Sequence, residues 1–457
     1  MASRTSLSGF PEWLPAERIV EQSFLDSIRR TFELNGFSSL ETRSVEPLDQ
    51  LLRKGEIDNE VYVLRRLHAG DDEGDAGLGL HYDLTVPFAR YVLENAGHLT
   101  FPFRRYQMQR AWRGERPQEG RYREFVQADI DVVDRDTLPA HYEVEIPLVV
   151  GEALRALPIP APVVQVNSRK LAEGFFRGVG AAEPSVALRA IDKLARIGPD
   201  AVAKLLVSEA GLSEAAARTC LELAGIRSFD TSFAERVTRL GVSDPMLDEG
   251  LADLVRVVEA TSATAPGLVM ADLRIARGLD YYTGMVYETL LTGYEDLGSI
   301  CSGGRYDSLA SDGKVFYPGV GMSVGVSRIL GLVLGRDLLA ASRSVPTCVL
   351  VAVTDEAART ASDGVAAQLR ARGIPCEVAP VAAKFGKQIR HADRRGIPYV
   401  WFLGDAPGDS SVKDIRSGDQ VPADPSVWEP PDEDRWPTVR SVVTESPVHL
   451  MHEEPSP

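Results

Sequence analysis

The residues best suited to chemistry lie between Tyr106 and Asp131. Over residues 126–132 apolar and polar side chains alternate, which is the period-two pattern of a strand. Four apolar side chains point one way: Val126, Ala128, Ile130 and Val132. The other face carries an amide and two carboxylates: Gln127, Asp129 and Asp131. Carboxylates suit an ammonium group or an imidazole N–H as partner.

A charged loop joins this strand to an earlier one that ends near Arg113. The loop is rich in guanidinium, carboxylate and amide groups: Glu115, Arg116, Gln118, Glu119, Arg121 and Arg123. Guanidinium forks match phosphate oxygens, so the loop could bind a polyphosphate. The same pattern also fits an ordinary antiparallel hairpin whose polar face meets water. The pattern alone leaves both interpretations open.

A second polar pair, Asp83 and Thr85, stands in the segment HYDLTVPFARYV. Two residues apart in an extended chain, the side chains share a face. A carboxylate and a hydroxyl displayed together could hold an α-ammonium group. Pro87 suits the first turn of a following helix. Thr85 could instead simply cap that helix, and the local sequence does not separate the two interpretations.

Two later segments combine aromatic, basic and small residues. In RGLDYYTG, Arg277 precedes Tyr281 and Tyr282, and the plain interpretation is an aromatic-rich core strand. In CSGGRYDSL, two glycines precede Arg305 and Tyr306. Glycines let the backbone approach a ligand closely, and Arg305 could contact a phosphate.

Hydrophobic periodicity predicts the elements that position these residues. Residues 17–36 and 142–156 are predicted helices, and residues 162–168 a strand. Residues 169–262 are rich in Ala and Leu, with helical segments broken at glycines. We therefore expect an all-helical insertion there. Its basic residues are interpreted as a solvated face: Lys193, Arg196 and Lys204.

Residues 345–420 form a separate unit, in which the apolar runs CVLVAV, CEVAPV and YVWFLG alternate with helical segments. That order predicts a parallel sheet with covering helices. The second helix carries basic side chains at helical spacing: Lys384, Lys387, His391, and Arg394 or Arg395. The stripe could follow a phosphate backbone, or it could be an ordinary surface helix. Residues 421–457, rich in Pro and acidic side chains, are expected to be mobile.

Composition limits the possible classes of protein. Hydrophobic content of 44% and charged content of 25% are ordinary for a globular chain, and no apolar run is long enough to predict a transmembrane helix. The N-terminus lacks the apolar core of a secretory signal. The four cysteines form no Cys-x-x-Cys pair, which argues against zinc and disulfides and fits the cytoplasm. The net charge of −16 weakens a nucleic-acid hypothesis without excluding it, because binding depends on local patches.

The stretch FRRYQMQRAWRGERPQEGRYREFVQADIDV resembles the second signature motif of class II aminoacyl-tRNA synthetases, in the form found in the histidyl-tRNA synthetase family. DLTVPFARYV, RGLDYYTG and GGRYD resemble motifs of the same family, and GVGMSVGVSRILGLVL resembles the third class II motif. The segment ending near Pro47 resembles the first motif, which builds the dimer interface. The resemblance covers about residues 10–420.

This resemblance implies a mixed α/β (α+β) fold, with an antiparallel sheet flanked by helices and a C-terminal α/β domain whose sheet is mostly parallel. The catalytic core would occupy residues 1–168 and 263–340, interrupted by the helical insertion at residues 169–262. An anticodon-binding domain would follow at residues 345–420, and then the acidic tail at residues 421–457.

The resemblance also implies roles for single residues. Histidine would be bound by Asp83, Thr85, Arg113, Gln127, Asp131, Arg277, Tyr281, Tyr282 and Tyr306. ATP would be bound by Arg113, Glu115, Arg121 and Arg328. Arg113 and Arg277 would be catalytic, on opposite sides of the α-phosphate. Asp83, Thr85 and Gln127 would hold the amino group. Asp131, with Tyr282 and Tyr306, would contact the imidazole.

The implied reaction activates histidine with ATP and transfers it to the 3′ end of tRNA(His). The tRNA acceptor end would meet Arg116, Gln118 and Arg123, and the anticodon domain would present Lys384, Lys387 and Arg394. The expected enzyme is a cytoplasmic homodimer that uses ATP with Mg²⁺ and needs neither zinc nor a membrane. The sequence does not place the Mg²⁺ ligands.

Two alternatives differ from this expectation. A non-catalytic histidine-sensing paralogue would usually lack the C-terminal domain and catalytic positions, whereas this chain keeps Arg113, Arg277 and Arg328. A synthetase for proline, threonine or glycine would share the C-terminal domain, but RGLDYYTG and Asp131 argue against it. One departure from the family pattern is Ser327, where Glu is common before the arginine of the third motif.

Overall fold

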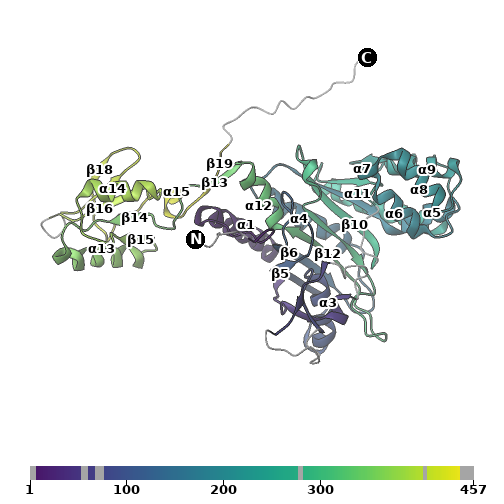
Figure 1. Ribbon diagram of the computed structural model, residues 1–457, viewed down its shortest axis with the longest axis horizontal. Helices are drawn as coiled ribbons and strands as arrows, with labels where there is room; N and C mark the ends of the chain where they lie inside the picture. Colours follow the sequence, from purple (N-terminus) through teal and green to yellow (C-terminus); the bar gives the residue numbers. More distant parts are fainter. Residues whose placement is uncertain (1–6, 53–59, 67–76, 276–280, 405–408, 443–457) are drawn as a thin grey trace, which may run out of the picture. The chain divides into compact units, whose positions relative to one another are not determined.

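In the computed structural model, the chain is described over residues 7–52, 60–66, 77–275, 281–404 and 409–442. It divides into two compact units (Figure 1). The first comprises residues 1–11 and 24–332, and the second residues 12–23 and 333–457. None of the helices in the described ranges is long and apolar enough to cross a membrane.

The first unit is built on a sheet whose described strands run in the order β1-β5-β6-β12-β11-β10-β7-β9-β8. The strands are β1 (Ser38–Ser39), β5 (Phe103–Trp112), β6 (Glu124–Val133), β7 (Pro162–Ser168), β8 (Arg227–Ser228), β9 (Val269–Asp272), β10 (Tyr282–Leu291), β11 (Cys301–Tyr306) and β12 (Gly319–Gly325). From β5 across to β7 every neighbouring pair is antiparallel. Only β1 and β9 pair in parallel with a neighbour. The expected antiparallel sheet is confirmed.

Helices cover this sheet. α4 (Tyr142–Arg155) packs on β6, β7 and β12 (Figure 1), and its Ile146 and Val150, one turn apart, are fully buried. The other helices are α1 (Pro15–Leu34), α3 (Thr85–Asn95) and α12 (Val326–Gly335), with short 3₁₀ turns η4 (Ala96–His98) and η5 (Glu295–Leu297). α1 buries Phe24, Ile28 and Phe32 at four-residue spacing. The predicted helical periodicity therefore identifies the faces that pack inward.

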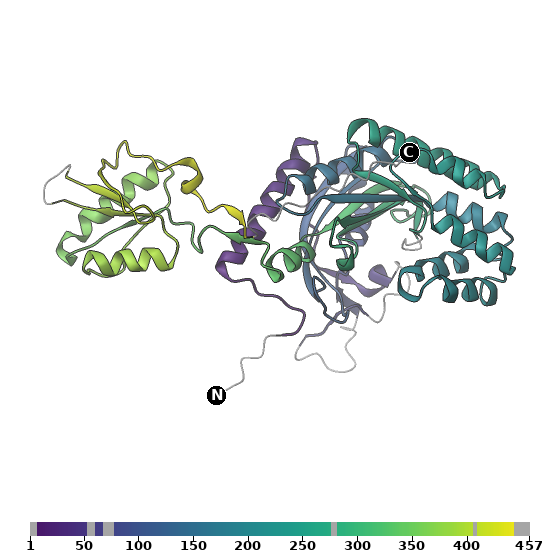
Figure 2. The same cartoon turned by 90° about the horizontal axis from the view of Figure 1, so that it is seen from above.

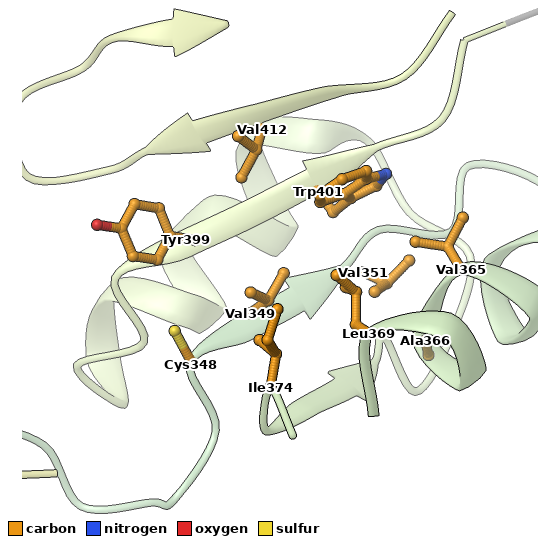
Figure 3. Close-up of a cluster of buried hydrophobic side chains, with 10 residues drawn as sticks. All are labelled: Cys348, Val349, Val351, Val365, Ala366, Leu369, Ile374, Tyr399, Trp401 and Val412. Carbon is orange, nitrogen blue, oxygen red and sulfur yellow. The ribbon is translucent and has the colours of Figure 1, made fainter. Parts of the chain in front are cut away.

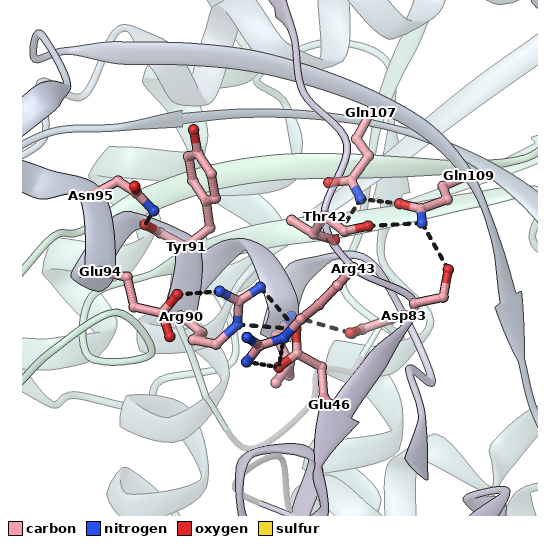
Figure 4. A network of polar contacts seen from close by, with 12 residues as sticks. Thr42, Arg43, Glu46, Asp83, Arg90, Tyr91, Glu94, Asn95, Gln107 and Gln109 are labelled. Atoms are coloured by element: carbon pink, nitrogen blue, oxygen red, sulfur yellow. Dashed lines mark hydrogen bonds and ion pairs between the residues drawn. The ribbon is translucent and has the colours of Figure 1, made fainter. Parts of the chain in front are cut away.

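A small sheet in the order β2-β4-β3 precedes the hairpin of β5 and β6. Its elements are β2 (Val45–Pro47), α2 (Leu48–Leu51), β3 (Val63–Leu64) and β4 (Leu78–Leu80). Glu46 of β2 is fully buried, and it forms ion pairs of 2.9 Å with Arg43 and with Arg90 of α3 (Figure 4). The two guanidinium groups offset the cost of burying the carboxylate and tie α3 to this sheet.

The helical insertion forms one group, drawn in teal in Figure 2. Its helices are α5 (Arg169–Gly178), α6 (Pro184–Asp192), α7 (Leu194–Ile197), α8 (Pro199–Ser208), α9 (Glu214–Ala224), α10 (Phe233–Thr238) and α11 (Pro245–Thr264). α5 and α11 cross at Gly174 and Gly250, where an added Cβ would lie 2.2 Å and 2.1 Å from a backbone nitrogen of the other helix. Only glycine permits so close an approach.

The second unit contains a sheet in the order β15-β14-β16-β17-β18. Its elements are β14 (Val349–Val351), η6 (Glu356–Ala358), α13 (Arg359–Ala371), β15 (Cys376–Val378), α14 (Phe385–Arg394), β16 (Tyr399–Phe402), β17 (Ser411–Asp414) and β18 (Gln420–Pro422). The three predicted strands β15, β14 and β16 are parallel, whereas β17 and β18 add in antiparallel fashion. Trp401 is fully buried in the core between this sheet and α13 (Figure 3).

The expectation of a mobile tail from residue 421 is wrong for its described part. Residues 421–442 contain the last two residues of β18, α15 (Asp432–Arg435) and β19 (Val439–Ser441), and β19 pairs with β13 (Leu339–Ala341). Trp428 packs edge-on against Trp401, with ring centroids 5.7 Å apart. The carboxylate of Asp434 accepts hydrogen bonds of 2.6 Å from Arg416. Acidic composition suggested disorder, but Asp434 is buried and forms an ion pair with Arg416. Residues 443–457 lie outside the described residues.

Candidate active site

The polar face of β6 is buried. Gln127, Asp129 and Asp131 are only 7%, 2% and 3% exposed, so the solvated-hairpin interpretation is wrong. The neighbouring strand β12 places Gly321 opposite Asp131 and Ser323 opposite Asp129. A Cβ added to Gly321 would lie 2.1 Å from Asp131 Oδ1. The missing side chain therefore gives the Asp131 carboxylate room to lie across the strand.

A fully buried arginine, Arg105, neutralises part of this acidic face. It lies directly opposite Asp131 in the β5–β6 hairpin, and its Nη2 is 2.7 Å from Asp131 Oδ2. The guanidinium also lies 4.2 Å from the centroid of the Phe88 ring. Arg105 was not among the site residues expected from the sequence. The signal was present, because Arg105, Gln107 and Gln109 repeat the two-residue spacing seen on β6.

Burial dominates the electrostatics of the two carboxylates. It raises the pKa of Asp129 to about 7, with Arg105 opposing the shift and Asp131 adding to it. Burial likewise raises the pKa of Asp131 to about 6, although Arg105 and the Tyr306 hydroxyl both favour its ionised form. A carboxylate at the edge of ionisation near neutral pH is typical of binding and catalytic sites.

Two tyrosines, Tyr282 and Tyr306, line an inner pocket of about 20 Å³ together with the carboxylates. Tyr306 donates a hydrogen bond of 2.8 Å to Asp131 Oδ1. The ring of Tyr281 lies 4.7 Å from that of Tyr282 and 6.2 Å from that of Tyr306. The pocket wall includes Thr85, Asp129, Asp131, Tyr282 and Tyr306. This space holds about one water, so a larger occupant requires side-chain movement.

Asp83 and Thr85 lie where α3 begins. Asp83 Oδ1 accepts a hydrogen bond of 3.1 Å from the N–H of Val86, so Asp83 rather than Thr85 caps the helix. Thr85 instead lines the inner pocket. Asp83 is 4% exposed, and its charge raises the pKa of both Asp129 and Asp131, which places it beside them. The structure thus brings together the predicted amino-group residues.

Gln127 is held in place at one end only. Its Nε2 donates to Ser323 Oγ at 2.5 Å. Its Oε1 is buried and has no hydrogen-bond partner among the described residues. A buried acceptor without a donor is costly, and a ligand N–H would supply one.

A larger cavity of about 660 Å³ adjoins the inner pocket. Arg113 lies on its wall with its guanidinium between the rings of Tyr82 and Phe125, 4.3 Å and 5.1 Å from the two centroids. Its Nε donates to the backbone oxygen of Tyr82 at 3.2 Å. Sequence reasoning did not single out Tyr82 or Phe125. They fix the direction of a cation that is still 27% exposed.

The other predicted ATP residues line the same cavity. Arg121 Nη1 lies 3.5 Å from Glu115 Oε2. Arg328 donates from Nη2 to the backbone oxygen of Leu297. Ser327, which stands in place of the usual Glu, accepts a hydrogen bond of 2.8 Å from the N–H of Val126 and so joins α12 to β6. The departure from the family pattern therefore has a structural role here.

The insertion supplies part of the cavity wall. Arg169, Arg189 and Lys193 line it together with the residues of the sheet. Lys193 is partly exposed and faces this cavity, whereas Arg196 and Lys204 are exposed elsewhere on the insertion. Nothing in the local sequence distinguished Lys193, because its neighbours in the cavity come from segments far away in the chain.

Several candidate residues lie elsewhere. Arg116 and Gln118 are exposed on the loop between β5 and β6, and Arg123 donates to the backbone oxygens of Glu115 and Ser8. Arg305, considered as a phosphate contact, instead faces Asp307 and Glu143, at 3.0 Å and 3.8 Å. Arg277 lies outside the described residues. In the described part of the chain no group of three or more His, Cys, Asp or Glu side chains could hold a metal ion.

The comparisons with known proteins agree on one family. Residues 9–329 match the family model described as histidyl-tRNA synthetase, and residues 347–425 match that of an anticodon binding domain. Histidine–tRNA ligases of Cutibacterium acnes and Micrococcus luteus are each 59% identical to this chain, over 96% of it and 99% of their own length. The crystal structure of histidyl-tRNA synthetase from Nostoc sp. PCC 7120 has a TM-score of 0.82 at 33% identity, and covers 92% of this chain and 97% of its own.

Proposed function

The chain belongs to the histidyl-tRNA synthetase family, and from that premise we propose how its two adjoining pockets carry out the reaction. It is an ATP-dependent class II enzyme that ligates histidine to tRNA. One observation supports the division of labour between the pockets. Tyr282, Ser302, Gly303 and Ser323 line both the inner pocket and the large cavity, so a molecule in one meets a molecule in the other.

The inner pocket holds histidine. Asp83, Thr85 and the unpaired Oε1 of Gln127 are the acceptors for its ammonium group. Asp131, Tyr282 and Tyr306 surround the imidazole. These polar groups favour a ring that carries N–H groups over an apolar side chain of similar size, because the apolar side chain could not form hydrogen bonds with them. Tyr281 backs this wall through its contacts with the other two tyrosines.

The large cavity holds ATP, with its α-phosphate beside the histidine carboxylate. A carboxylate oxygen attacks the α-phosphorus, the bond to the β-phosphate oxygen breaks, and pyrophosphate leaves. Arg113 and Arg277 reduce the repulsion between the two anions and stabilise the charge that develops. Arg121 and Arg328 hold the β and γ end, and Glu115 contacts the adenine.

Mg²⁺ accompanies the ATP phosphates. The cavity wall fits such an ion, because it includes the carboxylates of Asp192 and Glu288, and Mg²⁺ on a nucleotide takes its other oxygen ligands from the phosphates and from water. When bound, the ion would neutralise phosphate charge. Arg113, Arg121 and Arg328 do the same from the protein and also fix the direction of the phosphates.

The second step brings the tRNA terminus to the cavity mouth, where the terminal ribose hydroxyl takes the histidyl group and AMP leaves. Arg116, Gln118 and Arg123 contact the acceptor end. Lys384, just before α14, and Lys387 and Arg394 on α14 are all exposed and contact the anticodon arm. The enzyme acts as a homodimer in the cytoplasm, and sedimentation analysis tests that assembly.

The experiment that tests this assignment is histidine-dependent ATP–pyrophosphate exchange, with the other amino acids as controls. We expect exchange with histidine alone, followed by charging of tRNA(His). Binding of histidine without exchange would instead indicate a sensing paralogue. Changing Lys384, Lys387 and Arg394 together to alanine should lower charging and leave exchange unchanged, because the anticodon contacts act only in the second step.

A further inference from the structure

Asp129 differs from the carboxylates already assigned. Its Oδ1 accepts a hydrogen bond from the Ser323 hydroxyl. Among the described residues no ion pair or second hydrogen bond reaches it. Asp131, by contrast, has Oδ1 occupied by Tyr306 and Oδ2 by Arg105. Both acids line the inner pocket, so Asp129 has an oxygen available to an occupant.

Charged and polar groups face Asp129 from the elements packed around it. Among the described residues they are Asp83 before α3, Arg105 on β5, Asp131 on β6, Tyr282 on β10, the Cys301 thiol on β11 and the Ser323 hydroxyl on β12, and Tyr281 and Tyr306 lie beside Tyr282. Burial raises the pKa of each tyrosine, so all three are neutral. Burial raises the pKa of the Cys301 thiol as well, so it is also neutral. Asp131 forms an ion pair with Arg105, whereas no ion pair of Asp129 is formed within the described residues.

The ammonium group of the substrate is not the partner of Asp129. Asp131 is paired with Arg105, and the ammonium group of histidine is the partner of Asp83 in the proposed function. Asp129 is then the carboxylate left without a cation. A buried charge without a partner is strongly unfavourable. A proton that Asp129 binds or shares would neutralise this buried negative charge.

We propose that Asp129 is a specificity residue, and that it shares one proton with the imidazole ring of the bound histidine. This proposal rests on the proposed function, since it requires histidine in the inner pocket. The proton balance is the same whether the pair is written as carboxylate with imidazolium or as carboxylic acid with imidazole. The complex holds one proton between the two groups.

The free partners titrate close together. The ring of histidine has a pKa of about 6.5, and burial raises that of Asp129 to about 7. Well above pH 7 neither the free histidine ring nor Asp129 carries a proton, so the complex must take up one proton from solution when it forms. Well below pH 6.5 the histidine ring and Asp129 each carry a proton, so one of the two protons must be released when the complex forms. Histidine affinity is therefore highest between these values and falls up to tenfold per pH unit on either side.

Proton uptake tests the proposal directly. Histidine binding is measured by calorimetry at pH 8 in buffers of different ionisation enthalpy, for the full-length wild type and for Asp129→Asn. The amide has nearly the same shape, accepts from Ser323, and cannot ionise. We expect the wild type to take up close to one proton more than the variant. The ammonium group contributes equally to both proteins, so equal uptake overturns the proposal.

A kinetic profile gives a second readout. For the wild type, kcat/KM for histidine in the exchange reaction should fall on both sides of neutrality, because it reports the free enzyme and free substrate. Asp129→Asn should lose the alkaline fall, and its histidine KM at pH 7 should rise about tenfold or more while the KM for ATP stays within twofold. An unchanged alkaline limb overturns the proposal.

Ser323→Ala covers the case in which Asp129→Asn does not fold. It keeps the carboxylate and removes a hydrogen bond that favours ionisation, so the alkaline limb should move to higher pH. If the alkaline limb of the kcat/KM profile stays at the same pH, Asp129 is not the group that produces it. Histidine-dependent exchange by the wild type distinguishes failure of the Asp129 proposal from failure of the proposed function. If exchange is present but proton uptake is not, only the role of Asp129 fails, whereas absent exchange contradicts the proposed function.

Discussion

The inner pocket and the large cavity share walls but solve opposite electrostatic problems. In the inner pocket the carboxylates of Asp129 and Asp131 are at most 3% exposed. In the cavity the guanidinium groups of Arg113 and Arg121 are 27% and 38% exposed. One pocket is acidic and almost dry, and the other is basic and open to solvent.

The difference shows where each pocket finds its counter-charges. Buried charges are costly unless paired, and removing one partner leaves the other uncompensated. Half-exposed arginines are screened by water, so they add little to stability and remain available to phosphates. Changes in the inner pocket should therefore alter folding and recognition, and changes in the cavity should alter the rate.

The largest effect should follow from Arg105→Ala. The substitution removes the one guanidinium paired with Asp131 inside the described pocket and leaves that carboxylate buried alone. We expect the free energy of unfolding to fall by about 3–5 kcal/mol, measured by urea denaturation. Arg110→Ala is the matched control on the same strand. Arg110 is 62% exposed and pairs with Glu124, so it should cost about 1 kcal/mol or less. Equal losses would remove the distinction between the two regions.

Arg113→Ala should act on rate rather than on folding. Loss of a fixed cation at the α-phosphate should raise the activation barrier by about 3 kcal/mol, roughly a hundredfold in histidine-dependent exchange. The thermal midpoint should change little, because the side chain is partly solvated. Exchange at the wild-type rate would exclude Arg113 from the chemistry. A large drop in the thermal midpoint of unfolding would instead show that folding depends on the charges of the cavity as much as on those of the inner pocket.

Asp129→Asn should stabilise the protein at alkaline pH. The folded pKa of about 7 lies above the ordinary value of 3.8, so between these values the native state binds more protons than the unfolded chain. The free energy of unfolding of the wild type therefore falls as the pH rises from the ordinary pKa to the folded pKa, and it falls no further for this reason above pH 7. The variant lacks this loss and should be more stable than wild type by roughly 1–2 kcal/mol at pH 8. The gain should shrink toward pH 5. Melting curves at both pH values measure it, and a variant less stable than wild type at pH 8 would contradict the assigned pKa.

The smallest effect should come from Arg116→Ala. This side chain is exposed at the loop between β5 and β6 and is assigned to tRNA alone. Charging of tRNA(His) should lose about 1 kcal/mol, several-fold in kcat/KM, and the loss should grow weaker at high salt. Exchange is the internal control and should stay within twofold. A parallel fall in exchange would extend the role of the cavity arginines to this position.

Much of this organisation was predictable from local pattern. The alternation over residues 126–132 predicted β6, and the bounds of β7 at Pro162–Ser168 agree with the predicted strand. The pair of Asp83 and Thr85 was recognised, although which of the two caps α3 was decided only by the folded backbone. Backbone conformation follows from side-chain spacing over a few residues, and such spacing is visible in the sequence.

The sequence by itself determined which groups are available: acids and an amide on β6, guanidinium groups in its loop, and tyrosines and glycines near residues 281–306. Only the tertiary structure decided their partners. Ser323 meets Asp129 across 194 positions of the chain, and Lys193 reaches the cavity from the insertion. Strand pairing and helix packing make these choices, because they are set by burial over the whole unit rather than by local spacing. Burial also set the pKa of Asp129, since the same carboxylate in water would ionise near its ordinary value.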